Sequence, residues 1–579
     1  MLRETPGNPR ITLQSPAKLR ETQKRETTRN PAKPRETLQN PAKLRETQKR
    51  ETLRNPASPL SQFLSRIITV LPITSVSRPN ILIVETLNRV NERSKAVGKR
   101  PSLYKNSLVI AIGKAAQMLA RLKGGGGTAF PGLVVEKIAP SFAPTVLGAM
   151  PYGVVVVSGT NGKTTTTKIA TELFEMMGLR VLSNDTGSNF MRGVIAAILP
   201  RITLGGRLEA DIAVLELDEA HAVHFVKKVS PRYALLLNVM PDQLDRFGSV
   251  EYTAELLVQV ARHTTGTVVA NREDELLAGL GAVTPPLQVE LHWFGLSPQL
   301  ADSFSLSSKQ KRERLQGEER TEQLSASVVL SAVKGKMASF EIEGATYSTE
   351  LALKGIYNAY NAAAALALVR EVLREGSERF NLQPDQHPAL QPDLQPPPRP
   401  DHQPTHHPNQ SPPRHPDCQP VRRSDQQLIE ALAKVQGAFG RGESFVIGGR
   451  EVEMVLVKNS GGFQLALESF DPQGHDTMIV INDEAGDGRD ISWLFDVNFA
   501  SLQKTGITMV SGTRAYDMAL RLHYDEVPFR QVELDLITAL DYLLSDATSR
   551  DKPLRIYCCY TAMTKLHARL NALAKTGGR

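Results

Sequence analysis

A chain of 579 residues, 41% of them hydrophobic, has room for three or more domains of ordinary size, each with a buried core. The net charge of +8 belongs to the first 59 residues, which hold fourteen basic and six acidic side chains and leave fifty-five of each sign in the remainder. The neutral body argues against a nucleic-acid partner, and three cysteines exclude a disulfide framework.

The first 106 residues are predicted to be a largely disordered repeat and extension. The segment 13–22 recurs at 38–47 with a proline in each copy and few bulky apolar side chains, too little to offset the entropy lost on ordering. A basic arm that touches anionic lipid or nucleic acid is the alternative. Arg66 and Pro72 interrupt the apolar segment 63–76, so no run reaches membrane-spanning length and we expect a cytoplasmic protein.

A glycine-rich turn after a buried strand is the strongest motif of the chain. Four valines at 154–157 predict the strand, and apolar spacing after Thr164 predicts a helix. At such a junction backbone N–H groups face an anion, a solvated Lys163 can reach the outer phosphates of a nucleotide, and the Thr164 hydroxyl can ligate Mg²⁺. A chance Gly-Lys-Thr turn is the alternative. The predicted phosphate-binding residues are Gly159, Thr160, Asn161, Gly162, Lys163, Thr164 and Thr165.

Three further apolar runs, at 212–217, 233–238 and 267–270, predict strands that alternate with helices. Such alternation is typical of an α/β domain in which a parallel sheet has helices on both faces and ligands bind beyond the carboxyl ends of the strands. Glu216 lies at one of these ends and is the predicted metal partner of Thr164. A merely solvated carboxylate is the alternative.

A block rich in proline, glutamine and histidine, at 376–425, separates two differently patterned regions. Its histidines could bind a metal, but no folded frame fixes their geometry, so a disordered linker is the preferred interpretation. The expected domains on its two sides are 107–375 and 426–579. Short apolar runs predict a second, Rossmann-like α/β unit after the linker, with strands at 453–457, 478–481, 508–511 and 555–560.

Four motifs, in order, resemble those of the Mur ligase family of ATP-dependent enzymes, which join an amine to a carboxylate through an acyl phosphate. They are the turn at 159–164, Glu216, the pattern of Asn238, Asp242, Gln243 and Asp245, and a Gly-x-x-Asn-x-x-Asn pattern that holds Asn358 and Asn361 ahead of an alanine-rich helix from Ala362. The resemblance implies a phosphate-loop central domain with a mostly parallel sheet. It also implies catalytic roles for Lys163 and Glu216, Mg²⁺ held by Thr164 and Glu216, and nucleotide contacts from Asn238, Asp242, Asn358 and Asn361.

Within that family, the second half of the chain resembles the MurT branch. The likeness covers residues 107–574 without the linker and is carried by segments at 184–193, 438–443, 457–463, 487–496 and 512–515. It implies ATP-dependent amidation of the D-glutamate α-carboxylate of lipid II to D-isoglutamine in peptidoglycan synthesis. Ammonia would come from a GatD-type glutaminase subunit of the class I amidotransferases.

The MurT resemblance also assigns residues outside the cradle. Basic residues are assigned to the substrate because cations suit an anionic ligand. The alternative is that these residues are ordinary surface charges. One aspartate of the C-terminal domain, Asp487 or Asp490, would complete the Cys-His centre of the glutaminase, with a helix cap or turn as the alternative. The predicted substrate-binding residues are Asn189, Arg192, Arg441, Lys458 and Arg514.

The cysteines set two further expectations. MurT proteins often carry a four-cysteine zinc ribbon, but the segment 296–350 holds no cysteine, so no structural zinc is expected. Cys558 and Cys559 lie in an apolar run that favours inert packing over a glutaminase centre, so a partner subunit is required. The expected cofactors are ATP and Mg²⁺, and the lipid-linked substrate would bring the protein to the membrane surface.

Two other interpretations stay open. One is an amino-acid-adding ligase of the MurE or folylpolyglutamate synthase type, against which the cluster at 487–493 argues. The other is a non-catalytic nucleotide-binding scaffold in a cell-wall complex. The presence of Lys163, Thr164 and Glu216 together disfavours the scaffold.

Overall fold

The computed structural model describes ten stretches of the chain. The expected repeat and most of the Pro/Gln/His-rich linker lie outside them, so the prediction of disorder there stays a prediction. The described residues are 101–122, 129–184, 190–242, 249–303, 324–353, 355–381, 424–436, 441–484, 486–546 and 552–575.

Within these residues, nine strands form one sheet in the order β2-β3-β1-β4-β5-β6-β7-β8-β9. The pairs from β2 to β7 are parallel, and β7, β8 and β9 pair antiparallel. The bounds are β1 Gly153–Ser158, β2 Val181–Ser183, β3 Ile212–Glu216, β4 Tyr233–Leu236, β5 Thr267–Asn271, β6 Glu290–Leu296, β7 Val328–Lys334, β8 Met337–Ile342 and β9 Ala345–Glu350.

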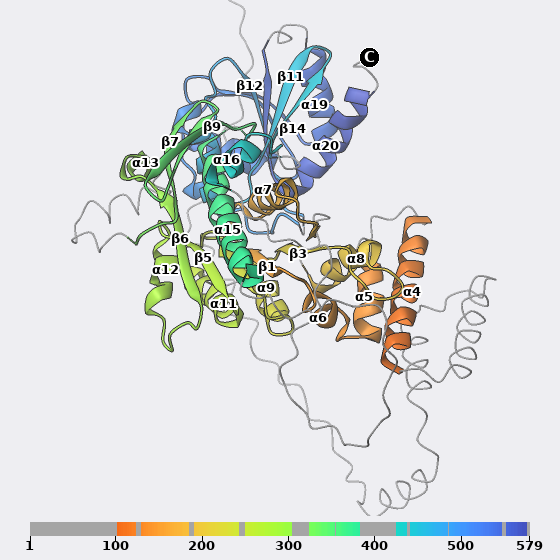
Figure 1. Cartoon of the computed structure of the whole chain (residues 1–579). Coiled ribbons are helices and arrows are strands. Elements are labelled where there is room, and N and C mark those ends of the chain that lie inside the picture. Colours follow the sequence, from red (N-terminus) through yellow and green to blue (C-terminus); the bar gives the residue numbers. More distant parts are fainter. Residues whose placement is uncertain are drawn as a thin grey trace, which may run out of the picture. The chain divides into compact units, whose positions relative to one another are not determined.

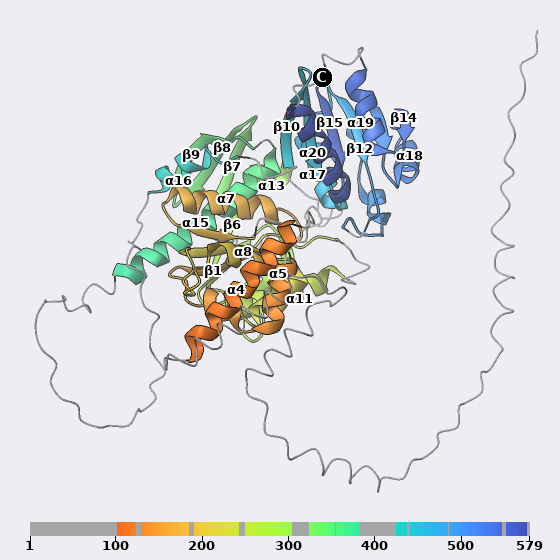
Figure 2. The same ribbon diagram turned by 90° about the vertical axis from the view of Figure 1, so that its right-hand side faces the viewer.

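Helices cover both faces of this sheet, as the alternating pattern predicted. One face packs on α7 and α15, and small alanine side chains let α15 lie close to the strands. Helices α4, α5 and α8 lie side by side in both views (Figure 1 and Figure 2). The bounds are α4 Pro101–Leu122, α5 Phe130–Ile138, α6 Phe142–Leu147, α7 Lys163–Met176, α8 Met191–Arg201, α9 Glu219–Val226, α11 Val250–His263, α12 Glu275–Ala278, η3 Gly279–Ala282, α13 Pro298–Ser303, α15 Ile356–Asn381 and α16 Asp425–Leu432.

The second sheet has the order β10-β11-β15-β12-β13-β14 among the described residues. All its pairs are parallel except β10 with β11. Side chains of α17 and α18 fill the core on one face, and those of α19 and α20 fill the core on the other. The bounds are β10 Arg441–Ile447, β11 Arg450–Leu456, α17 Ser460–Ser469, β12 Asp476–Val480, η4 Ser492–Asp496, η5 Ala500–Leu502, β13 Ile507–Ser511, α18 Ala515–Tyr524, β14 Phe529–Glu533, α19 Leu536–Ser545, β15 Leu554–Cys558 and α20 Tyr560–Lys575.

All eight strands predicted from apolar runs are present within three residues at each end. Among the strands that were not predicted, β2 is short, β8 alternates between buried and more exposed residues, and β9 and the edge strand β14 are largely exposed. Helix α15 begins at Ile356, before the expected Ala362, and runs past the expected domain end at 375. Helix α16 packs into the first core, although the boundary at 426 cuts through it. The expected domain bounds therefore stay approximate predictions.

No helix in the described stretches combines the length and the apolar character that crossing a bilayer needs.

Candidate active site

Two left-handed glycines shape the turn between β1 and α7. Gly159 has a φ of 131° and Gly162 a φ of 87°, values that residues with a side chain rarely adopt. A Cβ on Gly159 would lie 2.9 Å from the backbone nitrogen of Asn238, and a Cβ on Gly162 would collide with Asn361 Oδ1. Glycine at both positions lets the loop follow a tight path into the N-terminus of α7, where backbone N–H groups favour an anion.

Asn238, after β4, holds this loop in place. The N–H of Thr160 donates to the Asn238 backbone oxygen at 2.9 Å, and the N–H of Asn161 donates to Asn238 Oδ1 at 2.8 Å. Asn238 Nδ2 donates in return to the Asn161 oxygen at 3.0 Å. In the structure Asn238 therefore positions the cradle, and its contact with a nucleotide stays a prediction.

The Lys163 side chain folds back over the loop. Its Nζ donates to the backbone oxygens of Gly159 and Thr160, the latter at 3.2 Å, and lies 3.8 Å from Glu219 Oε2. Only 11% of the Lys163 side chain is exposed. The expectation of a solvated lysine was wrong, because the loop carbonyls and the start of α9 surround the ammonium group.

The predicted metal pair lies together. Thr164 Oγ1, in the first turn of α7, donates to Glu216 Oε1 at 2.9 Å. The Asn184 amide fixes the end of β3, since its Nδ2 donates to the Glu216 oxygen and its Oδ1 accepts from the Glu216 N–H, both at 2.8 Å. A hydroxyl beside a carboxylate suits Mg²⁺. Sequence reasoning missed Asn184 as a site residue, although it opens the MurT-like segment 184–193.

The two asparagines of the Gly-x-x-Asn-x-x-Asn pattern lie in the first turns of α15. Asn361 approaches Gly162 of the cradle, and Asn358 is fully buried. Between them, the Tyr360 hydroxyl donates to Asn271 Oδ1 at the end of β5. The tyrosine thus fastens the helix start to the strand ends, which brings the second asparagine to the phosphate loop.

The loop before α17 contacts the cradle from the second sheet. Asn161 Nδ2 donates to Asn459 Oδ1 at 3.1 Å, and Asn459 Nδ2 donates to Asn161 Oδ1 at 3.0 Å. Asn459 also caps α17, since its Oδ1 accepts from the Gly462 N–H at 2.8 Å. Lys458 Nζ donates to Asp242 Oδ2 at 2.8 Å. A predicted substrate residue and a predicted nucleotide residue thus bond each other, and Asn459, which was not predicted, joins the site.

The two aspartates of the C-terminal cluster differ in their contacts. Asp487 accepts from the Thr561 N–H at 2.8 Å and from the Thr561 hydroxyl, which fixes it at the start of α20. Asp490 is exposed and accepts from the Ser492 N–H at 2.8 Å, the turn contact that was the alternative for it. This hydrogen bond lowers the pKa of Asp490. Neither contact tests a role toward a partner subunit.

Two other predicted substrate residues, Arg192 and Arg514, pair with carboxylates outside the cradle. Arg192 Nε donates to Glu136 Oε2 on α5 at 3.2 Å. Arg514 Nε lies 3.1 Å from Asp517 Oδ2. Arg441 lies in β10, but its side chain is not among those that the structure describes. Asn189, Gln243 and Asp245 also lie outside the described residues.

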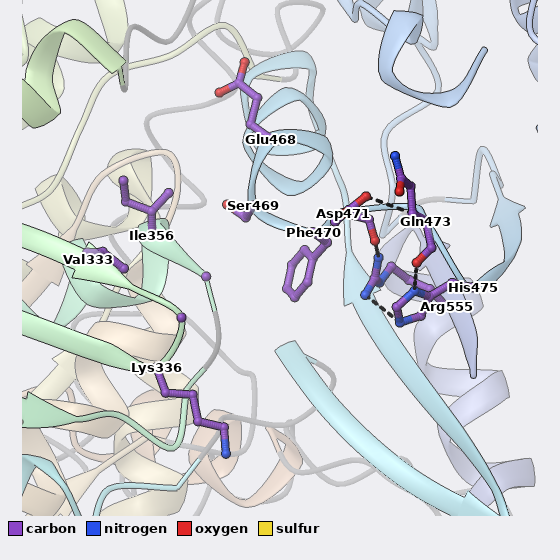
Figure 3. A pocket seen from close by; sticks show the side chains of 12 residues that line it. Val333, Lys336, Ile356, Glu468, Ser469, Phe470, Asp471, Gln473, His475 and Arg555 are labelled. Carbon is purple, nitrogen blue, oxygen red and sulfur yellow. Dashed lines mark hydrogen bonds between the residues drawn. The ribbon is translucent and has the colours of Figure 1, made fainter. Parts of the chain in front are cut away.

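A separate hollow of about 700 Å³ lies between the β7–β8 turn and the segment after α17 (Figure 3). Arg555 is one of the residues that line this hollow. The Arg555 guanidinium lies 5.1 Å from the centre of the Phe470 ring and donates to His475 Nε2 at 3.0 Å. Gly355, which opens the asparagine pattern, also lines it. The phosphate-loop residues do not line it.

Both described cysteines are buried. Burial raises the pKa of Cys558 well above its ordinary value and raises the pKa of Cys559 to about 12. Because the thiolate is the reactive form, we expect iodoacetamide at pH 8 to leave both unmodified in the native protein and to modify both after denaturation. Peptide mass spectrometry checks this, and rapid alkylation of either cysteine in the native protein would contradict it.

The free energy of unfolding should fall as the pH rises from about 9 toward 12, because the thiols ionise at a lower pH in the unfolded chain than in the folded protein.

The comparisons with known families match both halves of the chain. A Mur ligase middle domain matches residues 157–369, and a MurT ligase C-terminal domain matches residues 456–563. Among solved structures, MurF from Acinetobacter baumannii shares the fold with a TM-score of 0.53 and 16% identity, over 77% of this chain and 81% of that one. The chain is therefore a ligase of the Mur family.

Two curated relatives narrow the branch. The MurT subunit of lipid II isoglutaminyl synthase (glutamine-hydrolyzing) from Streptococcus pneumoniae is 26% identical over 79% of this chain and 95% of its own length. The subunit of the same name from Staphylococcus aureus is 23% identical over 76% of this chain and 92% of its own length. Within the Mur ligases, the chain is of the MurT type.

Proposed function

We propose that this chain is the ATP-dependent ligase subunit of a glutamine-hydrolysing synthase that amidates the D-glutamate α-carboxylate of lipid II. The observation that carries the proposal is the cradle, in which Lys163, Thr164 and Glu216 lie together at the carboxyl ends of β1 and β3. The match of the C-terminal half to the MurT domain supports the choice of substrate.

The proposed chemistry has two steps. A carboxylate oxygen of D-glutamate attacks the γ-phosphorus of ATP, so that a carbon–oxygen–phosphorus linkage forms, the bond to ADP breaks and ADP leaves. Ammonia then attacks the carbonyl carbon, phosphate leaves, and loss of a proton gives the amide. Repulsion between a carboxylate and a triphosphate opposes the first step, so the site must neutralise charge.

The residues of the cradle fit that need. Lys163 supplies one positive charge, and backbone N–H groups of the loop and the α7 N-terminus supply partial charges. Thr164 Oγ1 and Glu216 Oε1 would hold Mg²⁺, which would neutralise phosphate oxygens when bound. Asn361, which lies beside Gly162, would contact the nucleotide.

The ammonia source is the second part of the proposal. The two described cysteines are buried and have raised pKa values, so neither suits glutamine hydrolysis. A separate GatD-type glutaminase would supply ammonia, and Asp487 or Asp490 would reach its Cys-His centre. The names of the relatives, which call each a subunit of a glutamine-hydrolyzing enzyme, support a partner. The lipid-linked substrate would place the complex at the membrane surface.

Reconstitution tests the proposal. The full chain is mixed with a GatD-type glutaminase, ATP, Mg²⁺, lipid II and glutamine labelled with ¹⁵N in its amide. We expect lipid II to gain the label at D-glutamate, with ADP and phosphate formed in step, and we expect the chain alone to hydrolyse no glutamine.

Two outcomes would contradict it. Addition of a whole amino acid to the substrate would indicate an amino-acid-adding ligase. Binding of ATP without product formation in the complete mixture would indicate a non-catalytic scaffold. A second mixture contains ammonium chloride in place of the glutaminase. Product in this mixture alone would show that the partner failed, and absence of product from both mixtures would show that the ligase failed.

A further inference from the structure

Glu219 is a buried carboxylate next to the cradle. It is the first residue of α9, and the preceding Asp218 caps that helix by accepting from the Ala220 N–H at 3.2 Å. Only 5% of Glu219 is exposed. Burial of a carboxylate is unfavourable unless a positive partner or hydrogen bonds compensate.

The positive partner that faces Glu219 is Lys163, at 3.8 Å between Nζ and Oε2. The lysine ammonium has three N–H donors, and two of them point to the loop carbonyls of Gly159 and Thr160. The carboxylate of Glu219 attracts the same ammonium group. The Glu219 carboxylate and the two loop carbonyls thus define one position for the Lys163 ammonium group, which the flexible four-carbon side chain would not fix by itself.

We propose that Glu219 is the positioning residue of Lys163, which holds the ammonium over the loop where the phosphates of ATP would meet it. The inference rests on the proposed function, in which Lys163 acts on ATP. A long side chain loses conformational entropy when a ligand fixes it, and prior fixation removes that cost from the reaction. Glu216 already accepts a hydrogen bond from Thr164, its partner in the proposed Mg²⁺ site. The two carboxylates therefore have separate tasks, because Glu216 would bind the metal and Glu219 holds the Lys163 ammonium group.

Amine labelling tests the pair without any activity. The full chain is treated with a limiting N-hydroxysuccinimide ester in the absence of nucleotide, and labelling at single lysines is followed by mass spectrometry. We expect Glu219→Gln to raise labelling of Lys163 several-fold and to leave Lys168, on the same helix, unchanged. Glu172→Gln is the matched control, because Glu172 pairs with Lys168 at 3.6 Å. It should raise labelling of Lys168 alone.

Kinetics of the reconstituted enzyme supply the second measurement. We expect Glu219→Gln to lower kcat about tenfold or more while KM for ATP stays within about threefold, because the carboxylate acts on the placement of Lys163 rather than on the nucleotide. Glu219→Asp should recover part of kcat, since it restores the charge.

Several results would overturn the inference. Unchanged labelling of Lys163 in Glu219→Gln would show that the carboxylate does not hold it. Increased labelling of every lysine would show a general loss of structure. A raised Mg²⁺ requirement with normal Lys163 labelling would assign Glu219 to the metal. If ATP and Mg²⁺ fail to protect Lys163 of the wild-type protein from labelling, the proposed function is refuted. The comparison of Glu219→Gln with wild type in the absence of nucleotide would still show whether Glu219 holds Lys163.

Discussion

Lys163→Ala is expected to lower ATP turnover about 10²- to 10³-fold, because it removes the only full positive charge that the described side chains of the loop bring to the phosphates. It should also lower the free energy of unfolding by about 1–3 kcal/mol, since Glu219 loses its charged partner in a buried place. ADP release by the reconstituted enzyme and a urea titration measure the two effects.

Lys168→Ala is the matched control for this prediction. Lys168 lies on the same helix, 36% of its side chain is exposed, and its pair with Glu172 spans one helical turn. Such a surface pair contributes about 0–1 kcal/mol, so turnover and stability should both stay near wild type. Near-normal turnover in Lys163→Ala would refute the assignment of the cradle.

Glu216→Gln is expected to lower kcat about 10²-fold at physiological Mg²⁺ and to raise the Mg²⁺ concentration that half-saturates turnover. The amide still accepts the 2.9 Å hydrogen bond from Thr164 but lacks the charge that attracts the ion. A Mg²⁺ titration of ATP turnover measures the shift. Thr164→Val, which removes the hydroxyl ligand, should shift the requirement in the same direction.

Asp218→Asn controls for loss of a neighbouring carboxylate. Asp218 caps α9 through its side-chain oxygen, and asparagine caps helices equally well. Its Mg²⁺ requirement should equal that of wild type. An unchanged requirement in both Glu216→Gln and Thr164→Val would contradict a metal site at this pair.

The central fold followed from the sequence because local patterns and tertiary structure agree there. Four valines in a row suit a central parallel strand, which is buried on both faces, and β1 has that place between β3 and β4. Polar residues at the carboxyl ends of such strands meet at one edge, which is why Thr164 and Glu216 were paired correctly across 52 positions of the chain. The strands β8, β9 and β14 carry weaker patterns because parts of them face solvent.

The contacts from the second sheet could not be read from the chain. Asn459 lies 298 residues from Asn161, and Lys458 lies 216 residues from Asp242. Each pair depends on how the loop before α17 lies against the phosphate loop, and no periodicity encodes that. The same limit applies to the contact of Arg192 with Glu136 on α5, and the role of Arg192 toward a substrate stays a prediction.

By itself, the sequence determined the phosphate loop, the strands that carry it and the residue types that suit ATP and Mg²⁺, because glycine conformation and apolar periodicity act over a few neighbouring residues. Only the tertiary structure decided that Lys163 is enclosed and that Glu219 faces it. Burial and charge pairing depend on side chains that approach from separate strands and helices, so they arise only when the sheet brings those elements together.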